Sequence, residues 1–203
     1  MKLFERILNK LQTPNNESLK MSLNNCHVRG MFSLVVDGAE FGKLTRIFLA
    51  ENKLKPFEVQ LHTHRYPIRL TTIKGDINHH NAVKDEKGLV NMSEYSYKSF
   101  LNGGNGLEYV GETKVNCFDY KLPIGSTITL GTEDYHTMSC TKNSIWIVEE
   151  LGFETQESSI LGVPFVLDGL YSEPAMFQIN DKCQVVIREL KKILENYRAA
   201  NAL

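Results

Sequence analysis

The stretch from Phe57 to Gly75, FEVQLHTHRYPIRLTTIKG, decides how this chain is expected to fold. Apolar and polar residues alternate up to the segment His62-Thr63-His64, and this alternation predicts a β-strand. In a strand, residues i and i+2 point to the same face and lie about 6.5–7 Å apart. Two imidazoles at that spacing can converge on one metal ion, with metal–nitrogen bonds of about 2.1 Å. The stretch therefore predicts a strand that presents a metal-binding pair, but it identifies no reaction.

Short strand-like runs continue on both sides of this stretch, separated by turn residues such as Pro67 and the pair Gly75-Asp76. The glycine-rich segment Gly103–Gly106 is interpreted as a hairpin loop, because no helical pattern follows it to form a phosphate cradle. Many short strands at close spacing predict an antiparallel sandwich or barrel. The expected strands are Phe32–Val36, Leu44–Leu49, Phe57–His62, Ile68–Ile73, Ile77–Val83, Tyr95–Leu101, Leu107–Tyr109, Lys114–Leu122, Thr127–Leu130, His136–Cys140 and Ser144–Leu151.

Two amphipathic helices are expected to flank this β region. Apolar residues recur with a helical period over Lys2–Gln12 and again over Lys182–Ala199. Asn180 or Asp181 is expected to cap the second helix. Each apolar face is expected to cover the core of its own chain, although the first helix could instead pair with a partner chain, as in a homodimer.

The composition favours one ordinary domain. A chain of 203 residues can bury a sizeable core without disulfides or a structural metal. It carries 23 basic and 24 acidic residues, so its net charge of -1 gives no field that would attract nucleic acid or a membrane surface. We predict a single domain, 1–203, with a helical segment at 1–25, a β-barrel at 31–152 and an extension at 153–203 that ends in a helix.

The cytoplasm is the expected compartment. The four cysteines show no CxxC spacing and are interpreted as reduced thiols. The N-terminus lacks the continuous apolar run and small-residue cleavage site of a secretory signal. No apolar stretch approaches the roughly 20 residues that a bilayer requires. We therefore expect a soluble, cytoplasmic protein.

Two groups of residues resemble the paired motifs of the cupin superfamily. His62-Thr63-His64 followed by Gly75 is similar to the first motif, G-x5-H-x-H-x3,4-E-x6-G. Pro123-Ile124-Gly125 and the downstream His136 are similar to the second, G-x5-P-x-G-x2-H-x3-N. The resemblance covers roughly residues 57–140. It implies an antiparallel jelly-roll barrel that holds a metal through the two motif-one histidines, the motif-one glutamate and the motif-two histidine.

The chain departs from both motifs at positions that matter for such a metal. Pro56 stands where the first motif begins with glycine, and the glutamate position falls on Ile68 or Arg69. The segment before His136 lacks the proline of the second motif, and Cys140 stands at its asparagine. Neither isoleucine nor arginine is an ordinary metal ligand, so the motif-one carboxylate is missing.

Three histidines therefore remain as candidate metal ligands, namely His62, His64 and His136. Imidazole suits iron, zinc, copper and nickel alike, so the ligands alone do not select the metal. Among the cupins, three histidines without the glutamate are similar to the thiol dioxygenases, which oxidise a small thiol at non-haem iron and commonly hold a substrate carboxylate with an arginine. By this resemblance Fe(II) is the expected metal, with zinc, nickel or manganese as alternatives. Arg69, or more weakly Arg46, is the expected arginine.

Other polar residues are candidates for the pocket lining. Tyr66 and Tyr135 flank the ligand histidines, and Tyr135 is our candidate for a catalytic hydroxyl, although either ring could simply close the barrel mouth. The neighbours His79-His80 face opposite sides of a strand, so only one could line the pocket, and ordinary strand positions are expected for both. Glu149-Glu150 are split in the same way, and a solvated strand end is expected for them.

Three classes of function stay open. The first is a metal-dependent oxygenase of small molecules with Fe(II) on the three histidines. The second is an isomerase or lyase in which zinc, nickel or manganese acts as a Lewis acid. The third is a non-catalytic module that binds a small ligand or a partner. The missing glutamate favours the first class, whereas the broken second motif and the added helices favour the third.

Overall fold

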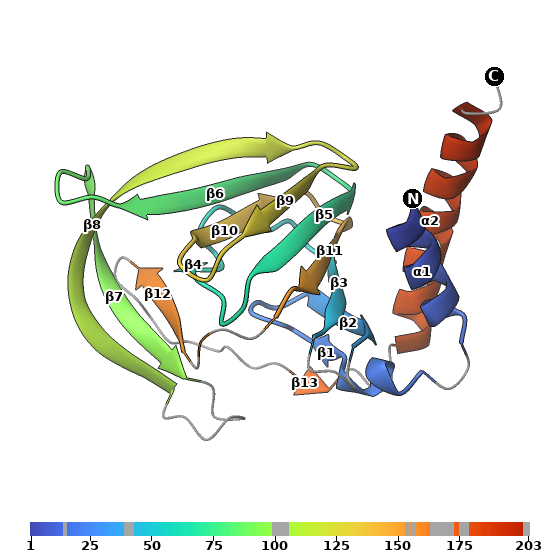
Figure 1. The fold of residues 1–203 in the computed structure, drawn as a ribbon, viewed down its shortest axis with the longest axis horizontal. Helices are drawn as coiled ribbons and strands as arrows, with labels where there is room; N and C mark the ends of the chain where they lie inside the picture. Colours follow the sequence, from blue (N-terminus) through green and yellow to red (C-terminus); the bar gives the residue numbers. More distant parts are fainter. Residues whose placement is uncertain are drawn as a thin grey trace.

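The computed structural model shows two antiparallel β-sheets with a pair of helices at one end (Figure 1). The structure describes residues 1–13, 16–38, 43–98, 106–152, 155, 157–162, 173–174 and 179–200. This arrangement confirms the prediction of a mainly β, antiparallel, jelly-roll-like fold with flanking helices. None of the helices in the described part is long and apolar enough to cross a membrane.

The first sheet has seven strands, and its central strands are buried on both faces. Antiparallel pairing joins residues far apart in the sequence, so that Trp146 lies opposite both Phe48 and Thr72. In spatial order the strands are β13 (Glu173–Pro174), β1 (Leu23–Asn24), β2 (Met31–Asp37), β3 (Thr45–Ala50), β11 (Ser144–Glu150), β5 (Ile68–Lys74) and β9 (Thr127–Leu130).

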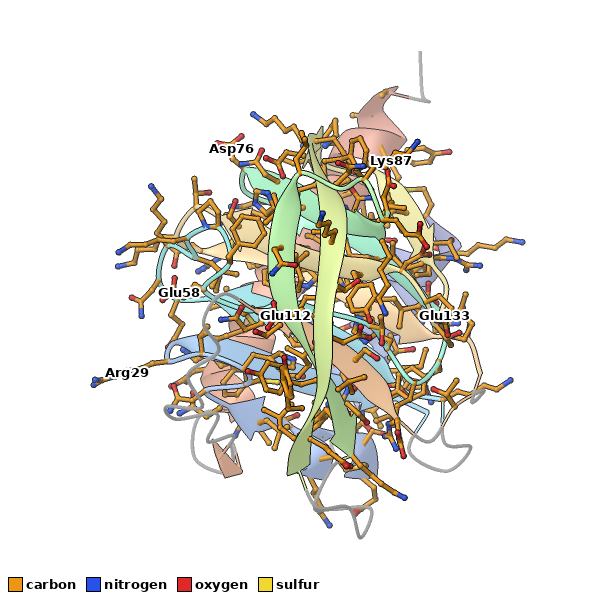
Figure 2. The ribbon with its side chains drawn as sticks, turned by 90° about the vertical axis from the view of Figure 1, so that its left-hand side faces the viewer. Arg29, Glu58, Asp76, Lys87, Glu112 and Glu133 are labelled. Carbon is orange, nitrogen blue, oxygen red and sulfur yellow. The ribbon has the colours of Figure 1, made fainter. Side chains whose placement is uncertain are left out.

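The second sheet closes into a barrel. Its strands in order are β10 (Tyr135–Cys140), β4 (Leu61–His62), β12 (Ser158–Gly162), β7 (Val90–Lys98), β8 (Gly106–Leu122) and β6 (Ile77–Lys84). Figure 2 looks onto the long β7–β8 ribbon, which carries Glu112. One buried side chain from each strand fills the barrel interior, namely Leu61, Ala82, Met92, Val115, Tyr135 and Leu161.

The two helices cover the outer face of the first sheet. α1 (Lys2–Leu11) and α2 (Ile179–Ala200) pack together beside β2, and the short 3-10 helix η1 (Glu17–Met21) follows α1. Their apolar residues join Ile47, Leu49 and Ile147 in one buried cluster, so α1 packs within its own chain as expected. The cap prediction was wrong, because α2 already begins at Ile179 and includes Asn180 and Asp181.

A second buried cluster fills the space between the two sheets. Phe48, Trp146 and Leu70 come from the first sheet, and Met138 and Cys140 come from β10. The inner face of the first sheet therefore carries the even-numbered residues of β3 and β11, whereas the odd-numbered ones face the helices. This alternation determines which polar side chains can reach a site between the sheets.

The structure differs from the expected strands in several places. β7 begins at Val90 rather than at Tyr95, and β8 is one continuous strand where Leu107–Tyr109 and Lys114–Leu122 were expected as two. β12 adds Ser158–Gly162 to the barrel, in a segment where no strand was expected. The expected strand at Phe57–His62 is reduced to β4, and Phe57 itself has a left-handed backbone, with φ of 59°, that strands exclude. The expected hairpin loop at Gly103–Gly106 lies outside the described residues, except for its last glycine in β8.

Candidate metal centre

His62 and His64 lie on the same face of one short segment, as their spacing predicts. The Thr63 backbone N–H donates to Ser159 O at 2.9 Å, and the Ser159 N–H donates to Thr63 Oγ1 at 2.8 Å, so both partners come from β12. His62 Nδ1 lies 2.8 Å from the Gln60 carbonyl oxygen, which can only accept a hydrogen bond. Nδ1 therefore carries the proton, and the lone pair on Nε2 is left free for a metal.

His136 completes a cluster of three imidazoles. It lies directly opposite His62 in the pairing of β10 with β4. His64 Nε2 and His136 Nε2 are 2.8 Å apart, and the nitrogen ligands of all three rings lie within 4.8 Å of one another. The centroids of the three rings are 4.9–5.0 Å apart. The three side chains brought together are those that the sequence singled out, and their geometry could hold one metal ion.

The electrostatics of this cluster suit a metal cation. Burial, followed by repulsion from His27, lowers the pKa of His62 to about 4. Burial, followed by repulsion from neighbouring imidazoles, also holds the pKa values of His64 and His136 well below the usual 6.5. The rings are therefore neutral near pH 7, which is the form that binds metals. The donor set consequently fits a divalent ion.

The cluster lies between the two sheets rather than within the closed barrel. His136 shares its strand face with Met138 and Cys140, both of which pack against the first sheet. Leu61 and Tyr135, the chain neighbours of His62 and His136, point the other way into the barrel interior. The inner face of the first sheet therefore forms the opposite wall of the candidate site.

His27 lies beside the cluster, and the sequence analysis missed it. Its ring centroid is 5.8 Å from that of His62 and 6.4 Å from that of Phe48. Surrounding protein and the charge of Arg46 lower the pKa of His27 to about 4, yet its side chain keeps an exposed surface. The His27 backbone is left-handed, with φ of 68°, in the turn that precedes β2. A lone histidine in a loop gives no signal by which a sequence could place it here.

Arg46 faces this site from the first sheet. It shares its face with Phe48, and its guanidinium Nε lies 3.5 Å from the buried carboxylate of Glu150. Glu150 also accepts a hydrogen bond from the Leu44 backbone N–H at 2.8 Å. Burial and a hydrogen bond to Glu150 raise the pKa of Tyr66. Glu150 is thus a buried residue on the inner face, where a solvated strand end was expected.

Two predicted catalytic residues point away from the cluster. Arg69 lies between Ile68 and Leu70, which both face the inner cluster, so its own side chain faces the helices. There Arg69 Nη1 lies 3.7 Å from the Glu149 carboxylate, which also accepts a hydrogen bond from Arg6 of α1.

Tyr135 points into the barrel interior instead, and its hydroxyl donates to Glu94 at 2.9 Å. Strand parity removes both Arg69 and Tyr135 from the candidate centre. Their predicted roles are corrected on this ground.

The neighbours His79 and His80 take opposite faces, as expected, but both make specific contacts. His79 Nε2 lies 3.2 Å from His136 Nδ1. His80 hydrogen-bonds Asp119 through Nδ1 at 2.6 Å and Ser139 through Nε2 at 2.8 Å. This second set has the order of a serine–histidine–aspartate triad, but its hydroxyl is buried and its carboxylate is exposed. A substrate could not reach that hydroxyl. His80 therefore has a structural role, in which its two hydrogen bonds link β6 to β8 and β10.

Comparisons with known proteins give remote likenesses only. No protein-family model matches the chain, and no curated protein matches it in sequence. Hydroxypropylphosphonic acid epoxidase from S. wedmorenis matches in structure over 64% of this chain and 54% of its own, with 11% identity and a TM-score of 0.41. This chain thus spans about half the length of that enzyme.

Two further solved structures show the range of these likenesses. Hydroquinone 1,2-dioxygenase PnpCD, in complex with Cd2+ and 4-hydroxybenzonitrile, matches over 58% of this chain and 62% of its own, with 12% identity and a TM-score of 0.32. Drosophila melanogaster CENP-C bound to CAL1 matches over 72% and 91%, with 14% identity and a TM-score of 0.34. Likenesses at this level carry no argument about function.

Proposed function

We propose that this protein is a metal-dependent enzyme that oxidises a small anionic molecule at non-haem Fe(II). One observation carries the proposal: three neutral imidazoles converge, with two of their nitrogens 2.8 Å apart and all three ligand atoms within 4.8 Å. His62, His64 and His136 would hold the ion. Iron bound in this way supplies dioxygen chemistry, because three protein ligands leave positions open for substrate and dioxygen.

The charges around the centre favour an anionic substrate. Three neutral ligands leave both positive charges of a divalent ion uncompensated. Arg46 adds a further positive charge from the facing sheet, which lowers the pKa of His27. Glu150 accepts from the Nε of Arg46 and Ser33 Oγ accepts from its Nη1, each at 3.5 Å, but a guanidinium has further N–H donors that suit a carboxylate. We therefore assign to Arg46, rather than Arg69, the role of orienting an acidic group of the substrate.

The first experiment asks whether the site binds metal. Protein purified without a histidine tag and incubated with Fe(II) under anaerobic conditions should retain about one equivalent, and His64→Ala should lose it. His80→Ala is the control, because His80 is another histidine of the second sheet, buried and bonded to Ser139, and it lies on the strand face that points away from the cluster. Less than about a tenth of an equivalent in the unmodified protein would count against any metal function.

The second experiment asks what the metal does. Oxygen consumption by the Fe(II) protein, measured with a panel of small thiols and small carboxylic acids, should rise above the rate of Fe(II) alone with at least one compound. Bound metal without oxygen consumption for any compound would contradict the oxygenase proposal. That result would favour the isomerase or lyase class, in which zinc, nickel or manganese polarises the substrate.

A further inference from the structure

We propose that His79 is a positioning residue that holds the imidazole of His136 in the tautomer and orientation required for metal binding. The proposal rests on the metal centre described above. His79 Nε2 lies 3.2 Å from His136 Nδ1, and the two rings stack with centroids 5.2 Å apart and planes inclined by 25°. Partners of this kind on the second nitrogen of a ligand histidine orient the ring and tune its basicity.

The pairing of two neighbouring strands brings the two rings together. In the register of β6 with β10, His79 lies opposite Met138, and Asn81 lies opposite His136. His79 and His136 are therefore diagonal neighbours on one face, within reach of each other's rings. The Tyr120 ring from β8 also contacts His79, with centroids 4.8 Å apart. His79 is fully buried, so its contact with His136 is shielded from competing water.

These contacts determine which nitrogen of His136 and of His79 carries the proton. His136 Nε2 faces His64 Nε2 and must keep its lone pair to bind a metal shared with His64. The single proton of neutral His136 therefore sits on Nδ1 and is donated to His79 Nε2. His79 in turn carries its own proton on Nδ1. One hydrogen bond thus fixes the tautomers of both rings.

Packing alone does not explain a histidine at position 79. Its Nδ1 is buried and has no hydrogen-bond partner among the described residues. An unsatisfied buried polar atom destabilises a fold. An apolar side chain at position 79 would therefore stabilise the packing of the sheet at least as well as histidine does. His80 is different, because both of its nitrogens have partners. The contact with His136 is the remaining reason for the imidazole at position 79.

Metal affinity tests the role directly, with Co(II) as the probe in the 203-residue chain. His79→Leu removes the acceptor and should weaken Co(II) binding about 10–100-fold. The thermal unfolding temperature of the metal-free variant should stay close to that of the unmodified protein, because one buried nitrogen without a partner, His79 Nδ1, is exchanged for another, His136 Nδ1. His79→Gln restores an acceptor oxygen and should recover an affinity within about threefold of the original.

His80→Leu is the matched control on the opposite face of β6. It breaks two hydrogen bonds and should lower stability, yet it should leave the Co(II) affinity within about threefold. His79→Leu with unchanged affinity would overturn the proposal. So would a Gln variant that binds as weakly as the Leu variant, since the ring itself and not the acceptor would then matter.

The tautomer can be read without any variant, should His79→Leu fail to fold. In the Zn(II)-loaded protein, nitrogen NMR of the histidine rings should show a proton on His136 Nδ1 and metal on Nε2. A proton on His136 Nε2, or metal on Nδ1, would overturn the proposal. If the unmodified protein binds neither Co(II) nor Zn(II), the metal centre itself fails; if it binds and His79→Leu binds equally well, only the role of His79 fails.

Discussion

Replacing His136 by alanine should disable the candidate centre. His136 lies opposite His62, its Nε2 is 2.8 Å from His64 Nε2, and its Nδ1 is 3.2 Å from His79 Nε2. Structural zinc in small four-ligand sites is bound with about 10–16 kcal/mol, or about 2.5–4 kcal/mol for each ligand. Loss of one imidazole should therefore weaken binding by about 10²–10³-fold.

The same change also affects stability, and this contribution must be measured separately. The His136 side chain is 4% exposed, so alanine leaves a cavity and removes the hydrogen-bond partner of His64 and of His79. The cavity left by the imidazole and the loss of partners for His64 Nε2 and His79 Nε2 together predict a loss of about 2–4 kcal/mol in the free energy of unfolding of the metal-free protein. Urea unfolding measures this loss and shows whether the variant is still folded.

The affinity itself is measured by competition for Co(II) with a coloured chelator at neutral pH. His80→Ala gives the comparison, because it truncates another buried histidine of the same sheet. It should lower stability to a similar extent and leave the affinity within about threefold. A folded His136→Ala protein that binds Co(II) as tightly as the unmodified protein would refute the three-histidine site.

Three further predictions follow from the positions of individual side chains. The metal-free protein should lose stability as the pH falls from 6.5 toward about 4, the pKa of His62 in the fold, because the unfolded chain binds a proton there that the fold excludes. The loss is about 2 kcal/mol for this histidine at pH 5, and an unchanged urea midpoint between pH 7 and pH 5 would contradict it. Arg46→Gln should raise the KM for an acidic substrate about 10–100-fold, whereas Arg69→Gln on the opposite face should not, and equal effects in steady-state kinetics would refute the assignment. Tyr135→Phe should cost about 1 kcal/mol by losing its hydrogen bond to Glu94 and leave Co(II) affinity unchanged, and an altered affinity would place the tyrosine at the centre after all.

The position of the cluster has a consequence for access to the site. The buried cluster of apolar side chains and Tyr135 lies on the face of the barrel strands that points away from the three ligand histidines. The candidate site instead borders the inner face of the first sheet and the turn that carries His27, whose side chain keeps an exposed surface. A ligand would therefore approach beside His27, and substitutions in this turn should affect substrate binding more than substitutions on β7 or β8.

Local patterns in the sequence determined most of the strands and both helices. Thr127–Leu130 was predicted with the bounds that the structure shows, and the helical periods placed α1 and α2 to within a few residues. The shared face of His62 and His64 also followed from their spacing, because side chains alternate along any extended segment. These features depend on neighbouring residues only, so the sequence by itself is sufficient to predict them.

Long-range pairing decided the rest of the candidate site. The approach of His136 to His62 depends on the register of β10 with β4, and the approach of His79 depends on the register of β6 with β10. Resemblance to a motif could suggest His136, and strand alternation allowed one of His79 and His80 to line the pocket, but no local pattern chose between those two or indicated His27. Contacts between residues so far apart in the chain exist only once the sheets have formed.

Tertiary structure likewise decided which face of the first sheet points toward the candidate site. In β3, Ile47 and Leu49 are buried under the helices while Phe48 is buried between the sheets, so apolar side chains occupy both faces. When a strand is buried on both sides, its hydrophobic pattern no longer distinguishes inside from outside. The sequence could therefore propose an arginine for the site, but only the packing of helices on one side and the barrel on the other put Arg46 on the inner face and Arg69 on the face toward the helices.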